Sequence, residues 1–137
     1  MQPQESPARE SSALIELKRR QLDLLPWAIA KVNRQGIFTF GNNTLHHLLG
    51  IDQIEGRMLD ELFHGDDLML VRQQLESRFI SRASGQYQVE ATRPADGVRI
   101  DLLCSAMPET NEWGDVIGSI ALLRKLPFEE AAEDVIA

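Results

Sequence analysis

The last third of the chain alternates apolar and polar residues with a period of two, which is the pattern of half-buried β-strands. Two alternating runs, residues 86–92 and 98–108, flank Ala95-Asp96-Gly97, where the Asp-Gly pair favours a tight turn. The sequence therefore predicts two strands joined by a hairpin turn. Their apolar faces consist of Tyr87, Val89 and Ala91 in the first run, and of Val98, Ile100, Leu102, Cys104 and Ala106 in the second.

A third run, residues 116–123, follows a second turn at residues 111–114 and is apolar on both of its faces. An antiparallel strand that is covered on both sides needs a second layer. We therefore expect the N-terminal helix or another subunit to lie over one side of this strand. One face carries Val116, Ile120 and Leu122, and the other carries Ile117, Ala121 and Leu123.

The middle of the chain predicts two more strands and two helices. Residues 27–32 and 37–40 form strand-like runs around a loop that ends in Gly36. Either Asn42 or Asn43 caps a helical turn over residues 44–49, which Gly50 ends. Short helical pieces follow over residues 51–63, and a longer helix spans residues 66–80. The apolar positions of that longer helix are Leu68, Val71, Leu75 and Phe79.

The two ends of the chain differ from this β-rich body. Residues 1–10 are polar and predict a disordered lead. Residues 11–25 predict a flanking helix that starts at Ser11 or Ser12 and is stopped by Pro26. Residues 127–137 predict an acidic tail, or the start of a linker helix in which Pro127 is the first residue.

Composition excludes several kinds of protein. A length of 137 residues suits one domain, and the net charge of −7 argues against a nucleic-acid partner, because binding phosphates needs a basic face. Cys104 is the only cysteine, which excludes an intramolecular disulfide and a multi-cysteine zinc site. We see no signal peptide and no apolar run long enough to cross a membrane, so we expect a cytoplasmic protein with no membrane segment in this chain.

Taken in order, these segments make the chain resemble a PAS domain. The resemblance covers residues 24–126 and depends on several stretches occurring in order at suitable spacing. The matching stretches are LLPWAIAKVNRQGIFTFGNNTLHHLLG (24–50), GRMLDELFHGDD (56–67), ADGVRIDLLCSAMP (95–108) and WGDVIGSIALLRKL (113–126), with the long helix between the second and the third.

The resemblance implies an α+β fold: a five-stranded antiparallel sheet with helices over one face and an N-terminal flanking helix, with the PAS domain itself spanning residues 26–126. PAS domains are sensory and interaction modules of signalling proteins such as histidine kinases, and they usually lack catalytic activity. Many of them dimerise through an N-terminal helix and the exposed face of the sheet. We expect the same of this chain, including a homodimer, an effector domain or partner protein, and no enzymatic activity.

The resemblance also limits which cofactors the domain is expected to bind. Flavin domains that form a photoadduct carry a cysteine in the region that here reads NTLHHL (43–48), which has none. Haem-binding members use a histidine on the long helix, where this chain has Val71, and His64 lies just before that helix in a sequence that resembles the family's helix-start motif. Cys104, on an apolar strand face, is expected to behave as a small hydrophobic residue. A noncovalent flavin, a small apolar ligand or a fully packed core remain open, and haem is not favoured.

The remaining polar candidates favour structural roles. His46 and His47 are adjacent, so on a helix they diverge by about 100° and cannot chelate one ion from one face. We therefore predict no metal site. Asp66 and Asp67 suit the positive end of the long helix without further chemistry. The residues expected to shape structural motifs are Asn43, His64, Asp67 and Gly97.

Two functional hypotheses follow. In the first, the domain senses a small ligand or a redox state and relays it through dimer contacts to an effector. In the second, it binds no cofactor and acts only in dimerisation or docking. The predicted ligand pocket consists of Phe40, Leu48, Phe63, Val71, Leu75, Tyr87, Ile100, Leu102 and Ile120. The predicted dimer interface consists of Leu14, Leu17, Leu24, Ile117 and Leu123.

Overall fold

The computed structural model describes residue 21 and residues 27–127. In chain order its elements are β1 (Ala28–Asn33), β2 (Phe38–Gly41), α2 (Asn43–Leu49), the short 3-10 helix η1 (Leu59–Glu61), α3 (Gly65–Ile80), β3 (Gly85–Thr92), β4 (Arg99–Thr110) and β5 (Val116–Lys125). Apart from residue 21, the predicted flanking helix over residues 11–25 lies outside the described residues, and so does the predicted tail after residue 127.

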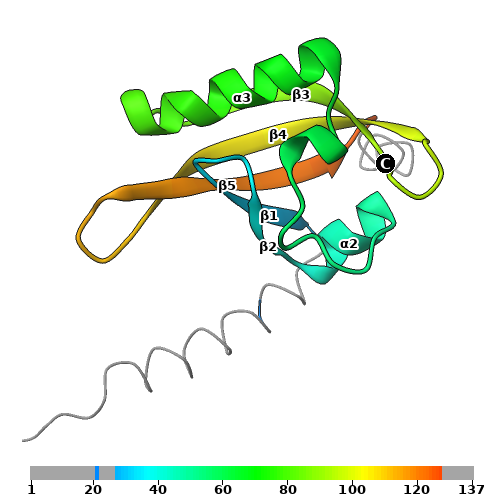
Figure 1. Ribbon diagram of the computed structural model, residues 1–137, viewed down its shortest axis with the longest axis horizontal. Helices are drawn as coiled ribbons and strands as arrows, with labels where there is room; N and C mark the ends of the chain where they lie inside the picture. The colour runs from blue at the N-terminus through cyan, green and yellow to red at the C-terminus, as the bar shows by residue number, and fades with distance from the viewer. Residues whose placement is uncertain (1–20, 22–26, 128–137) are drawn as a thin grey trace, which may run out of the picture.

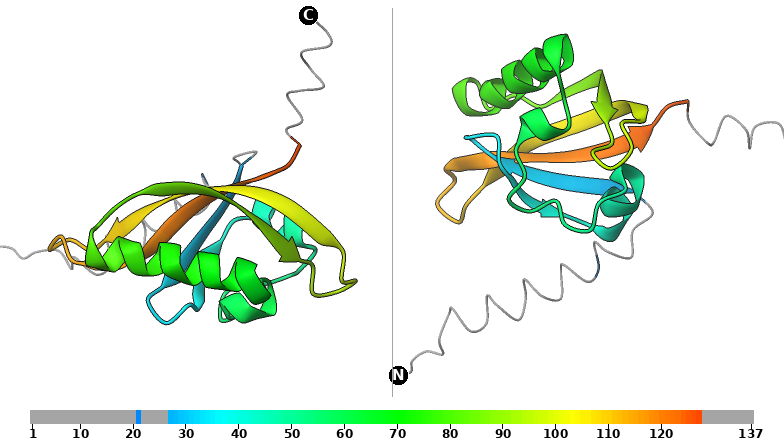
Figure 2. Two further views of the ribbon diagram at one scale, coloured as in Figure 1. Left: turned by 90° about the horizontal axis from the view of Figure 1, so that it is seen from above. Right: turned by 45° about the vertical axis from the view of Figure 1, so that its right-hand side comes forward.

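The five strands form one antiparallel sheet in the order β2-β1-β5-β4-β3. Figure 1 shows this order, and Figure 2 shows that the sheet is curved, with α2 and α3 on the same side of it. We call the side that faces the helices the inner face and the opposite side the outer face. The predicted α+β class, with a five-stranded sheet and helices over one face, is confirmed.

The last two strands are longer than the sequence predicted. The run that was expected to end at Pro108 continues to Thr110, and the final strand continues to Lys125. Pro108 is tolerated because β3 pairs with β4 only as far as Ala106, so beyond that point β4 has β5 as its one neighbour. A residue without a backbone N–H fits where one side of a strand is unpaired.

A bulge in β2 separates two phenylalanines that simple alternation would place on the same face. Phe38 pairs with Val32 and Phe40 pairs with Lys31, so Thr39 has no partner of its own in the ladder. An extra residue of this kind reverses the alternation of side chains beyond it. Phe38 therefore packs in the core on the inner face, whereas Phe40 shares the outer face with Lys31, whose ammonium lies 5.8 Å from the centre of the Phe40 ring.

Asn42 joins β1 to the start of α2 and is fully buried. Its side-chain oxygen accepts hydrogen bonds from the backbone N–H of Leu45 and of Ile29, each at 3.0 Å, and its amide nitrogen donates to the carbonyl of Trp27 at 2.7 Å. The sequence left the cap open between Asn42 and Asn43 and favoured Asn43. That choice was wrong: Asn43 is the exposed first residue of the helix, and Asn42 is the cap.

We predict that Asn42→Ala lowers the free energy of unfolding by about 3 kcal/mol, because a helix cap is lost together with two buried backbone partners. Asn43→Ala should cost less than about 1 kcal/mol, as exposed substitutions usually do. Denaturant unfolding of both variants measures the difference. Equal losses in the two variants would contradict the assignment of the cap.

Candidate functional site

The inner face of the sheet and the helices over it enclose one apolar core, which is the place where the sequence predicted a ligand pocket. Seven of the nine predicted pocket residues belong to this core or pack against it. The buried members are Phe63, Val71, Leu75, Ile100 and Leu102, and the partly buried members are Leu48 and Tyr87. Whether they enclose a ligand stays a prediction.

Phe40 and Ile120 were wrongly placed in the predicted pocket. Both are cross-strand partners of Lys31, Phe40 in β2 and Ile120 in β5. Directly paired residues in a sheet point to the same face. Both side chains therefore lie on the outer face, with the sheet between them and the core.

One residue of the predicted dimer interface, Leu123, was also placed on the wrong face of the sheet. Leu123 pairs with Ala28 and with Cys104, is 8% exposed and belongs to the core, so it cannot offer a contact surface to a partner. Ile117, the second residue of β5, is 45% exposed. The predicted interface residues Leu14, Leu17 and Leu24 lie outside the described residues. The sequence showed that β5 is apolar on both faces but could not show which face is the inner one.

Two of the residues expected in structural motifs, His64 and Asp67, lie at the start of α3, and a third, Gly97, lies in the turn between β3 and β4. Asp67 in the first turn of α3 accepts a hydrogen bond from the backbone N–H of Glu90 at 3.0 Å, which ties the helix to the edge strand β3. His64 is the N-cap residue of α3 but makes no capping hydrogen bond with its side chain. Gly97 has a φ of +73° in the turn between β3 and β4.

The paired histidines have separate environments. His46 is partly buried, and its Nε2 accepts the backbone N–H of Ile54 at 3.2 Å, so it holds the loop after α2. His47 is exposed. Throughout residue 21 and residues 27–127, no three His, Cys, Asp or Glu side chains are grouped so that they could hold a metal ion.

The inner side of α3 carries a residue that the sequence analysis missed. Val71, Leu75 and Arg78 are the buried residues of this helix, and Arg78 is only 1% exposed. Spacings of four and three residues place all three on one helical face. The sequence contained this signal, since Arg78 continues the stripe of Val71 and Leu75, but a charged residue was not expected in a core.

Three polar groups meet in this part of the core. The Tyr87 hydroxyl, from β3, donates a hydrogen bond to the Cys104 sulfur of β4, and Tyr87 also interacts electrostatically with Arg78. Burial lowers the pKa of the Arg78 guanidinium, and Tyr87 partly opposes that change. Burial likewise raises the pKa of Tyr87, and it raises the pKa of Cys104 to about 12.

The outer face bears an apolar hollow of about 460 Å³. Ile120 and Leu122 of β5 line it together with Met107 of β4, which is 53% exposed. Ser105 and the start of β3 at Ser84 and Gly85 complete its rim. This hollow therefore lies on the outer face of β5, and the inner face of the same strand packs in the core.

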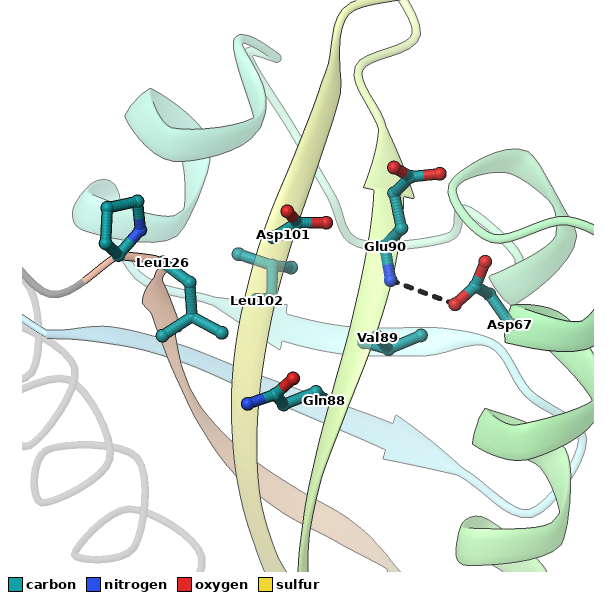
Figure 3. Close-up of a pocket in the computed structure, with 8 residues that line it drawn as sticks. Asp67, Gln88, Val89, Glu90, Asp101, Leu102 and Leu126 are labelled. Carbon is teal, nitrogen blue, oxygen red and sulfur yellow. Dashed lines mark hydrogen bonds between the residues drawn. The ribbon is translucent and has the colours of Figure 1, made fainter.

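A second hollow, of about 390 Å³, lies where the chain leaves β5 (Figure 3). Leu126 and Pro127 line it, and the backbone N–H of Leu126 donates to the Asp101 carbonyl at 2.8 Å. Asp67 and Glu90 stand on its opposite side, joined by the hydrogen bond drawn in the figure. The start of α3 and the end of β5 thus lie on opposite sides of this hollow, with β3 and β4 between them.

This arrangement, in which a central last strand separates a helix-covered core from an outer apolar face, defines an α+β domain. A family model described as the PAS fold matches residues 16–126. The chain therefore belongs to the PAS family, and the resemblance found in the sequence is confirmed. PAS domains are generally sensory and not catalytic. A search of curated protein sequences gives no match.

Solved structures share the fold at low sequence identity. A PAS domain from Colwellia psychrerythraea has a TM-score of 0.71 at 16% identity, with 82% of this chain and 97% of that chain covered. A LOV protein from Rhodobacter sphaeroides has a TM-score of 0.72 at 17% identity, with 92% and 74% covered. VqmA from Vibrio cholerae, crystallised in one case with ligand and DNA, has a TM-score of 0.67 at 18% identity, with 82% and 51% covered.

Every helix in the part of the chain that the structure describes is too short or too polar to cross a membrane.

We predict that Cys104 does not react with a thiol reagent such as dithionitrobenzoate in the native protein at pH 8. Its side chain is 2% exposed, and its pKa of about 12 leaves almost no thiolate at that pH. Absorbance of the released thiolate, compared between native protein and protein in guanidinium chloride, measures this. Rapid labelling of the native protein would show that the core around Cys104 is open.

Proposed function

We propose that the chain is the sensory module of a cytoplasmic signal-transduction protein. It holds a small ligand in the core under α3 and relays occupancy through a homodimer contact on the outer face to an effector. The supporting observation is the position of β5, which lies at the centre of the sheet between β1 and β4.

Alternate residues of β5 belong to the two faces. Ala121 and Leu123 pack with the core, whereas Ile120 and Leu122 line the outer hollow. Because neighbouring residues of one strand point to opposite faces, a shift of β5 that enlarges the core moves the outer side chains by a similar distance. A ligand in the core would thereby change the surface that a partner contacts, provided that the ligand prefers one of the two arrangements.

A second candidate is a domain that dimerises or docks without any ligand. Its support is the apolar outer hollow, which would serve as a contact surface whatever the core contains. In both candidates the domain itself catalyses no reaction. Neither candidate uses nucleic acid, since the net charge of −7 disfavours phosphate binding. The two differ in whether a small molecule changes the dimer.

We predict that the double variant Ile120→Glu, Leu122→Glu converts the dimer into a monomer. Each glutamate would place a charge in the outer hollow, where pairing with a second copy would remove it from water. Sedimentation equilibrium of the full chain measures the association.

The matched control is Ile80→Glu, because Ile80 is 74% exposed on α3 and lies away from the outer hollow. This control should remain dimeric, and circular dichroism should show that both proteins are folded. A double variant that is folded and still dimeric would refute the outer face as the dimer contact. A wild-type chain that is monomeric would refute the homodimer itself.

A further inference from the structure

Arg78 is the one charged side chain buried among the described residues, and no negative charge accompanies it. Within the part of the chain described, no carboxylate oxygen forms an ion pair with its guanidinium. An isolated charge in a protein interior is strongly unfavourable unless an opposite charge compensates it. The environment of Arg78 therefore lacks the partner that a buried guanidinium requires.

The hydrogen bonds of Arg78 are made to neutral oxygens. Nη1 donates to the backbone carbonyl of Ala83 at 3.0 Å, and Nη2 donates to Oε1 of Gln74 at 3.2 Å. Nε is buried and has no hydrogen-bond partner. A guanidinium offers five N–H donors in a planar fork that matches a carboxylate. The edge of the fork that contains Nε–H thus lacks the acceptor that would complete a bidentate pair.

Gly85, at the start of β3, has no side chain. Its absence leaves room for the amide of Gln74 and the guanidinium of Arg78. A Cβ atom at this position would lie 2.6 Å from Oε1 of Gln74 and 3.3 Å from Nη2 of Arg78. Any other residue would therefore crowd the amide and the guanidinium. The glycine, the orphan Nε–H and the buried charge occur at one place between α3 and the sheet.

We propose that this place binds the carboxylate of a small organic acid with an apolar body, with Arg78 as its charge partner. One guanidinium without a second buried cation matches one negative charge, which favours a monocarboxylate over a phosphate or a tricarboxylate. The apolar side chains of Val71 and Leu75 share the helical face of Arg78 and would contact the body of the acid. The carboxylate would replace Gln74 as acceptor, because charge-assisted hydrogen bonds are the stronger ones.

This proposal deepens the proposed sensory function by naming the class of ligand. The test uses the full chain with benzoate and hexanoate as probes, and benzamide and hexanamide as neutral matches of the same shape. The readouts are the thermal unfolding midpoint and the ¹H–¹⁵N resonance of the Arg78 Nε–H group. We expect both acids to raise the midpoint and to shift that resonance, and the two amides to do neither.

Two variants and one control make the test specific. Arg78→Met should bind the acids at least about tenfold more weakly, while its midpoint without ligand is equal to or above that of the wild type, because an uncompensated buried charge is removed. Gly85→Ala keeps the charge but fills the space beside it, so it should also weaken binding. Arg72→Met removes an exposed arginine of the same helix and should bind like the wild type.

Other outcomes overturn the proposal. If neither acid shifts the Nε–H resonance of the wild type, the site does not take a carboxylate. If Arg78→Met lowers the midpoint strongly and both variants bind acids like the wild type, Arg78 only holds the loop at Ala83. Neither result would refute the proposed sensory function. That function is tested separately by the dimer variants on the outer face, and this test does not depend on the chemistry of the ligand.

Discussion

The rest of the structure depends on the pairing of β5 with β1 on one side and with β4 on the other. This double ladder fixes the register that puts Leu123 between Ala28 and Cys104 in the core. The same register turns Ile120 and Leu122 outward. A slip of one residue would exchange the two sets, so one set of hydrogen bonds decides which residues of β5 lie in the core and which lie on the outer face.

The core that β5 closes is mostly apolar, but a group of polar side chains lies under the second half of α3. Arg78, Tyr87 and Cys104 come from three different elements, and burial makes each of them harder to ionise. A neutral thiol and phenol tolerate such a site, but a guanidinium stays charged at physiological pH. The core is therefore built around a positive charge, and a sensor of this kind would discriminate ligands first by their charge and then by their shape.

Sequence patterns predicted the order and type of the described elements, because alternation, glycine turns and the stripe of α3 are local features. They could not determine which face of β5 is the inner one, since both faces are apolar and only pairing with β1 and β4 decides. The bulge at Thr39 reversed the face of Phe40 for a reason that no local pattern shows. Arg78 lay on the predicted apolar stripe of α3, but its charge argued against a buried position, and packing of the helix on the sheet shows that it is buried.

The most direct test of the account is the dimer dissociation constant of the wild-type chain, measured by sedimentation equilibrium at increasing concentrations of benzoate. If the core and the outer face are coupled through β5, the acid should change the dimer dissociation constant. By thermodynamic linkage, the dimer and the monomer should then differ in their affinity for the acid by the same factor. A dissociation constant that stays the same while the Arg78 Nε–H resonance shows the site filled would contradict the coupling.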